Sequence, residues 1–140
     1  MTANRSANRS FRSLPQVDLG PAVRNGQTQI LALFHLYLNS PPDSRRAIVE
    51  TILHQLASHL ELEERLFQEI RRRGHGRKFV ADTELEHEKV KVMLLELQQF
   101  EGDDDQAMDE YFEDMMQSVR ALFSTEERDL LPLANRSWHA

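Results

Sequence analysis

The sequence predicts an all-α protein, an up-down-up-down antiparallel four-helix bundle with an internal pseudo-twofold repeat. Gly and Pro are scarce, at five each among 140 residues, while aliphatic residues and Met are common. Apolar residues recur at alternating spacings of three and four along four long segments, which is typical of helices packed nearly parallel. Short breaks separate these segments, so consecutive helices should be antiparallel neighbours within one domain.

The N-terminal residues differ in character from the rest of the chain. Residues 1–17 contain three Arg and no acid, which predicts a flexible N-terminal tail. Residues 18–140 should then form the bundle, with a short C-terminal tail. The first helix is expected from about Asp18 to Asn39, with Pro21 in its first turn. Its core-facing positions are Val23, Gln27, Ile30, Phe34 and Tyr37.

The second helix is expected from about Asp43 to Arg73, after the break "NSPPD". Its core-facing positions are Val49, Ile52, Leu56, His59, Glu63, Leu66 and Ile70. An imidazole and a carboxylate therefore occupy the middle of an otherwise apolar face.

The third helix follows "RRRGHGRK" and is expected from about Phe79 to Phe100. The fourth should begin near Asp105 and run to about Pro132 or a little beyond. The core-facing positions of the third helix are Val80, Thr83, His87, Val90, Leu94 and Leu97, and those of the fourth are Met108, Phe112, Met115, Val119, Leu122 and Glu126.

The faces of the four predicted helices match in pairs. The first corresponds to the third with an offset of 60, which places Gln27 on His87, and the second to the fourth with an offset of 63, which places Glu63 on Glu126. Two helical hairpins related by a pseudo-twofold axis would produce this pattern.

Polar residues interrupt the apolar faces at one level of the bundle: Gln27, His59, Glu63, His87 and Glu126. A buried carboxylate must be paired or coordinated, because an isolated one costs several kcal/mol or more. The chain has no Cys, so a metal site must use His and carboxylates. Two imidazoles and two carboxylates suit iron, manganese or zinc, which makes His59, Glu63, His87 and Glu126 the candidate metal ligands.

Four segments carry a resemblance to a known family. "GQTQILALFHLYL", "HLELEERLF", "EHEKVKVMLLEL" and "STEERDLLP" occur in order at bundle spacing. Together they resemble the hemerythrin-like, or HHE cation-binding, domains, whose helices carry in turn one His, HxxxE, one His and HxxxE. The resemblance covers roughly residues 18–134. It implies that Glu63 and Glu126 would bridge two irons, and that His59 and His87 would each cap one.

This sequence departs from the family pattern at two positions. Gln27 stands at the first-helix His position and Leu122 at the fourth-helix His position. Leu122 cannot coordinate a metal, whereas Gln27 could coordinate weakly through its amide oxygen or hydrogen-bond a carboxylate. The prediction is therefore a reduced site, either mononuclear or an incomplete diiron centre. The resemblance implies oxygen, nitric oxide or peroxide as the small ligand, or iron binding itself.

A second reading stays open, in which the site is vestigial and no cofactor is bound. Glu63 and Glu126 would then be held by His59, His87 and Gln27 in a hydrogen-bonded network, with one Glu protonated. The bundle would act as a protein-interaction or regulatory module. Scattered residues are also similar to bacterial anti-sigma regulators of the regulator-of-sigma-D type.

Composition narrows the partners. The formal net charge of −6 argues against nucleic acid, and no apolar run is long enough to span a membrane. The polar N-terminus lacks a signal-peptide pattern, so a cytoplasmic protein of bacterial type is expected. No nucleophile–base arrangement is recognisable, which leaves catalysis open and favours a non-enzymatic role. Basic and acidic turns at opposite ends of the bundle leave a protein partner or a homo-oligomer open.

Overall fold

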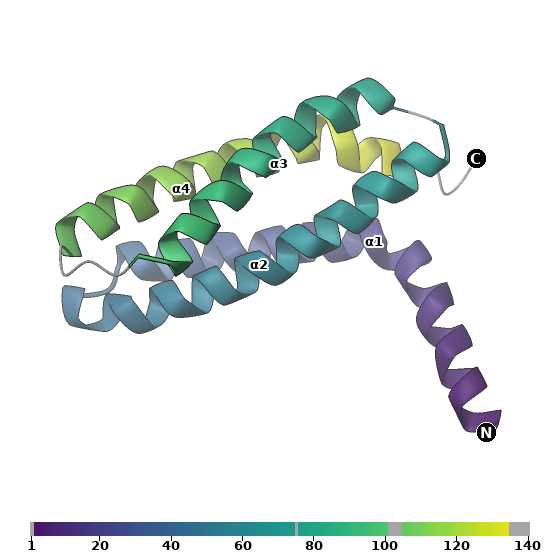
Figure 1. Ribbon diagram of the computed structural model, residues 1–140, viewed down its shortest axis with the longest axis horizontal. Coiled ribbons are helices and arrows are strands. Elements are labelled where there is room, and N and C mark those ends of the chain that lie inside the picture. The colour runs from purple at the N-terminus through teal and green to yellow at the C-terminus, as the bar shows by residue number, and fades with distance from the viewer. Residues whose placement is uncertain (1, 75, 101–104, 135–140) are drawn as a thin grey trace.

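The computed structural model describes residues 2–74, 76–100 and 105–134, with side chains from Leu19 onward, and these residues are almost wholly helical (Figure 1). The helical elements are α1 (Thr2–Leu38), α2 (Pro42–Arg72), α3 (Arg77–Gln98), α4 (Asp105–Thr125) and the π-helical segment η1 (Glu126–Leu130).

The four long helices form an antiparallel bundle (Figure 1). Each helix packs against the next in the chain, α4 also packs against α1, and η1 packs against α3. The predicted all-α four-helix bundle is therefore confirmed. The pseudo-twofold relation between the two hairpins stays a prediction.

The N-terminal part of α1 differs from the expected start at Asp18. The helix begins at Thr2, and its first part leaves the bundle and projects away from it (Figure 1). Leu19 is the first residue described as buried. The division into a tail over residues 1–17 and a bundle over residues 18–140 stays a prediction. Residues 135–140 of the expected C-terminal tail lie outside the described part of the chain.

Local sequence explains the sharp breaks between helices. Pro41 is extended, with φ −68° and ψ 156°, and Pro42 opens α2, where its missing N–H is not needed. Gly74 and Gly76 have φ of 80° and 68°, a left-handed conformation that glycine adopts without a steric penalty. The chain can therefore leave α2 and enter α3 within a few residues.

The apolar core is divided into two clusters. The long cluster contains the aromatic residues Phe34, Tyr37, Phe112 and Phe123, packed with aliphatic residues of all four helices. The short cluster consists of Leu19, Val23, Leu66, Phe67, Ile70, Val80, Leu130, Leu131 and Ala134. In the sequence of each helix, a buried polar residue stands between the members of the long cluster and those of the short cluster. These polar residues form a layer that separates the two clusters. This polar layer consists of Gln27, His59, Glu63, His87 and Glu126.

The fourth helix is not a regular α-helix to its end. The π-helical turn of η1 starts at Glu126, and the buried residues that follow are Leu130, Leu131 and Ala134. A regular alternation of three and four after Glu126 would bury positions 129 or 130 and 133. The wider π turn absorbs about one extra residue while Glu126 keeps facing the core.

Candidate metal centre

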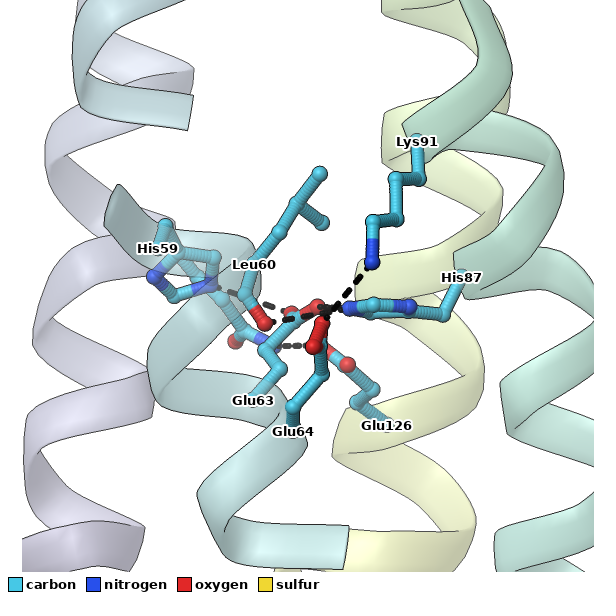
Figure 2. A network of polar contacts seen from close by, with 8 residues as sticks. His59, Leu60, Glu63, Glu64, His87, Lys91 and Glu126 are labelled. Atoms are coloured by element: carbon cyan, nitrogen blue, oxygen red, sulfur yellow. Dashed lines mark hydrogen bonds and ion pairs between the residues drawn. The ribbon is translucent and has the colours of Figure 1, made fainter. Parts of the chain in front are cut away.

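The polar layer brings together side chains from all parts of the bundle. Gln27 comes from α1, His59 and Glu63 from α2, His87 from α3, and Glu126 from the first position of η1. All five are buried, and Glu63 and Glu126 are 0% exposed. Figure 2 shows the functional groups of His59, Glu63, His87 and Glu126 converging between the helices. The sequence-based prediction that these positions face the core is therefore confirmed.

Three of the four predicted ligands form a tight cluster. His59, Glu63 and Glu126 each offer one ligand atom, and these atoms lie within 4.8 Å of one another. His59 Nε2 is 3.1 Å from Glu63 Oε2, because residues four apart lie on the same face of α2. Such a set of donors surrounds a volume that one cation could fill.

Several atoms of this cluster have no hydrogen-bond partner. They are His59 Nε2, both carboxylate oxygens of Glu63, and Glu126 Oε2. Buried polar atoms are nearly always bonded, and an unpartnered buried carboxylate is especially costly. The three side chains present an imidazole nitrogen and carboxylate oxygens, which are donors that iron, manganese and zinc accept. The residues therefore fit a divalent metal ion.

Gln27 holds one of the carboxylates in place. Its side-chain Nε2 donates a 2.8 Å hydrogen bond to Glu126 Oε1, which leaves Glu126 Oε2 free to face the cluster. Of the two roles expected for Gln27, the structure thus shows the hydrogen bond to a carboxylate.

His87 is turned toward a different partner. Its Nε2 lies 3.1 Å from the backbone oxygen of Leu60 and 3.7 Å from Glu63 Oε1 (Figure 2). A carbonyl oxygen only accepts, so His87 Nε2 carries the hydrogen and donates it. A nitrogen in that state has no lone pair for a metal. The predicted role of His87 as a ligand stays a prediction, and it would require this bond to break.

Burial controls the protonation of the layer. It raises the pKa of Glu63 to about 8. Burial, and then the charge of Glu63, raise the pKa of Glu126 well above its ordinary value. Burial also lowers the pKa of His59 and of His87. Without a cation, a proton therefore stays on the carboxyl pair of Glu63 and Glu126 near neutral pH. The imidazoles of His59 and His87 are neutral there.

Leu122 is fully buried in the long cluster and offers no donor to the layer. At this position, where the family pattern has His, the Leu122 side chain packs in the apolar core instead. It leaves the fourth helix with Glu126 as its contribution to the site.

Two bonds beside the layer were not predicted from the sequence. Thr125 Oγ1 donates to the Glu86 carboxylate at 3.1 Å, and Lys91 Nζ lies 3.4 Å from Glu64 Oε2. Each pair joins residues close to a layer position on neighbouring helices. The residue types did not predict these two pairs. Which residues meet depends on the axial offset between two helices, and the spacing of apolar residues along either helix does not determine that offset.

A family model of the hemerythrin HHE cation binding domain matches residues 22–134 of this chain. The chain belongs to the hemerythrin HHE family. The match extends over all four helices and includes every residue of the polar layer. A hemerythrin-family domain with a buried His–Glu cluster is a metal-binding type of protein.

Neither the curated proteins nor the solved structures contain a significant match to this hemerythrin-family chain. Within the part of the chain that the structure describes, none of the helices has the length and apolar character needed to cross a membrane.

Proposed function

We propose that the chain binds one divalent metal ion through His59, Glu63 and Glu126. Iron is the first expectation, with manganese or zinc as alternatives. The observation that carries the proposal is the set of buried atoms without hydrogen-bond partners, which converge from α2 and η1. A cation at their centre would neutralise two carboxylates that are otherwise costly to bury.

We propose a mononuclear site, because the donor cluster consists of three side chains whose ligand atoms lie within 4.8 Å of one another. A second ion would need further nitrogen ligands. Leu122 supplies none, and His87 Nε2 donates to the Leu60 carbonyl. The family pattern has six protein ligands for two irons, and this chain keeps four of those residue types.

The chain's own residues would shape the surroundings of the ion. Gln27 fixes the direction of Glu126, and the apolar clusters on both sides keep water out. When bound, the ion would supply Lewis acidity or a redox couple at a site with coordination positions not taken by protein. Hemerythrin domains bind small ligands such as O2 at their metal sites. We infer oxygen, nitric oxide or peroxide as the ligand class, in a sensing or handling role rather than classical enzyme catalysis.

A metal-free regulatory bundle is the second candidate, and one observation favours it. A proton shared by Glu63 and Glu126 lowers the free-energy cost of burying both carboxyls without a metal ion. Gln27 also donates a hydrogen bond to Glu126. The protein would then act through its surface on a protein partner. Either role fits the cytoplasmic, bacterial setting that we infer from the sequence.

Metal content tests the two candidates directly. Protein purified without a His-tag or chelator, and titrated anaerobically with ferrous iron, should hold about one metal ion per chain by elemental analysis. Glu63→Ala and Glu126→Ala should each abolish binding, because each removes one of only three donors. His54→Ala is the matched control, since His54 is exposed on the same helix and should leave binding unchanged.

Two results would contradict the mononuclear proposal. Two irons per chain with an oxo-to-iron absorption band would mean that other groups replace the missing ligands. The absence of any metal, with no thermal shift on adding iron, manganese or zinc, would leave the metal-free candidate.

A further inference from the structure

Gly26 lies against the ring of His59, across the interface between α1 and α2. A Cβ atom at position 26 would come within 2.4 Å of His59 Nδ1 and 2.7 Å of Cε1. Both distances are far shorter than a van der Waals contact. No side chain can therefore occupy position 26 while the ring keeps its place.

The glycine is unfavourable where it stands. It lies in the interior of α1, where Gly destabilises a helix relative to Ala. Close packing of a neighbouring group is one reason for a glycine inside a helix. Here the neighbouring atoms supply that reason, because all three of the nearest atoms belong to the His59 ring.

The other nitrogen of the same ring, Nε2, faces the candidate metal centre. Nδ1 and Cε1 lie on the side of Gly26, and Nε2 lies 3.1 Å from Glu63 Oε2. Phe123 of α4 contacts the ring edge-on, with centroids 5.3 Å apart. The imidazole thus contacts both the bare backbone of α1 and the ring of Phe123, and a push from position 26 would move Nε2.

We propose that Gly26 is a positioning residue, which lets His59 place Nε2 against the carboxylates of Glu63 and Glu126. This inference rests on the proposed function for its effect on metal binding. Its steric part concerns the metal-free chain and stands independently.

A double-mutant cycle in metal-free protein tests the steric part. Helix propensity alone would raise the melting temperature in Gly26→Ala, whereas the clash with His59 should lower it. In the His59→Ala background the clash is gone, so Gly26→Ala should raise the melting temperature or leave it unchanged. Asn25→Ala, at the exposed neighbouring position, is the control and should behave alike in both backgrounds.

The cycle remains decisive if a variant fails to fold. Gly26→Ala that unfolds while Gly26→Ala/His59→Ala folds would support the proposal. Failure of both, or a higher melting temperature for Gly26→Ala with His59 present, would overturn it.

The positioning role has its own readout. In folded Gly26→Ala, anaerobic titration with Fe²⁺ should give a Kd at least about tenfold higher than in the parent, with Asn25→Ala unchanged. The ring signals of His59 in nuclear magnetic resonance should shift in metal-free Gly26→Ala, while those of exposed His35 stay in place. Unchanged affinity together with unchanged ring signals would overturn the role. A parent protein that binds no metal would remove the proposed function alone, since the ring signals and the cycle still report on Gly26.

Discussion

Two facing carboxyl groups, Glu63 and Glu126, determine the chemistry of the polar layer at the scale of single residues. Both are fully buried, and no basic side chain among the described residues forms an ion pair with Glu126. Among the described residues, Glu63 has ion-pair contacts with the imidazoles of His59 and His87, which are neutral. The negative charge of Glu63 and Glu126 must therefore be cancelled by a proton or by a cation. The proton and the cation compete for the same carboxylate oxygen atoms.

The stability of metal-free protein should consequently fall as pH rises from about 6.5 to 8. At pH 6.5, the ordinary pKa of His, the unfolded imidazoles are half protonated while folded His59 and His87 are less so, which opposes the fall; this contribution vanishes as the pH rises to 8. The pKa of Glu63 is about 8 in the folded protein and 4.5 as its ordinary value, so the folded chain binds the extra proton in this range. The free energy of unfolding then decreases with pH, because fewer protons are bound in the unfolded state.

Glu63→Gln should reduce this pH dependence and raise the stability of the metal-free protein at pH 8, since it removes a buried group that ionises. Denaturant unfolding at pH 6.5 and 8 measures both effects. Glu61→Gln, on the exposed side of α2, should keep the slope of the parent. An undiminished slope in Glu63→Gln would show that other groups cause the pH dependence.

The sequence predicted which residues face the layer, but not how each side chain is used. Helical periodicity placed Gln27, His59 and Glu126 in the core, and the structure confirms this. The bond from His87 to the Leu60 carbonyl depends on a ring rotation and on the height of α3 against α2. Neither quantity is contained in the spacing of apolar residues. Gly26 did carry a signal, as a glycine one residue before a polar core position.

At the scale of elements, periodicity predicted the four helices and most of their ends. The expected ends of the first three helices lie within two residues of Leu38, Arg72 and Gln98. The π turn was missed because consecutive apolar residues, Leu130 and Leu131, fit either of two registers. An irregularity of one residue leaves no trace where both neighbouring positions are apolar.

The π turn predicts an unusual tolerance to deletion. Removing exposed Glu127 from η1 should restore a regular α-helix and keep the short cluster in place, at a cost below about 2 kcal/mol. Removing Gln117, exposed within α4, should rotate everything after it by about 100° and turn Glu126 out of the layer. Thermal unfolding followed by circular dichroism compares the two. Equal damage from both deletions would contradict this reading of η1.

At the scale of the whole molecule, the first part of α1 is outside the bundle (Figure 1). A chain that begins at residue 18 keeps Leu19, the first residue described as buried in the core. We expect its free energy of unfolding to change by less than about 0.5 kcal/mol, and its metal content to be unchanged. Denaturant unfolding and elemental analysis check this. A large loss of stability would mean that residues 1–17 belong to the bundle.

Three of the five Lys and Arg residues in the basic turn over residues 71–78 form ion pairs within the chain. Arg72 and Arg73 contact the buried carboxylate of Glu69 at 2.6 and 3.2 Å, and Arg71 pairs with Glu84. These cations also lie at the C-terminus of α2, where the helix dipole favours them. Internal pairing therefore accounts for Arg71, Arg72 and Arg73. Docking of a protein partner at this end stays a proposal, and residues 101–104 of the acidic turn lie outside the described part of the chain.

The division of the core by a polar layer has a consequence for how the molecule opens. Apolar burial is the main source of cohesion, and here it is interrupted across the full width of the bundle. The short cluster holds fewer residues than the long one. Its last members, Leu130, Leu131 and Ala134, lie at the end of the irregular π-helical segment η1 or just after it. Transient openings should therefore begin at that end and stop at the layer, so that backbone amides on its two sides exchange with solvent at different rates.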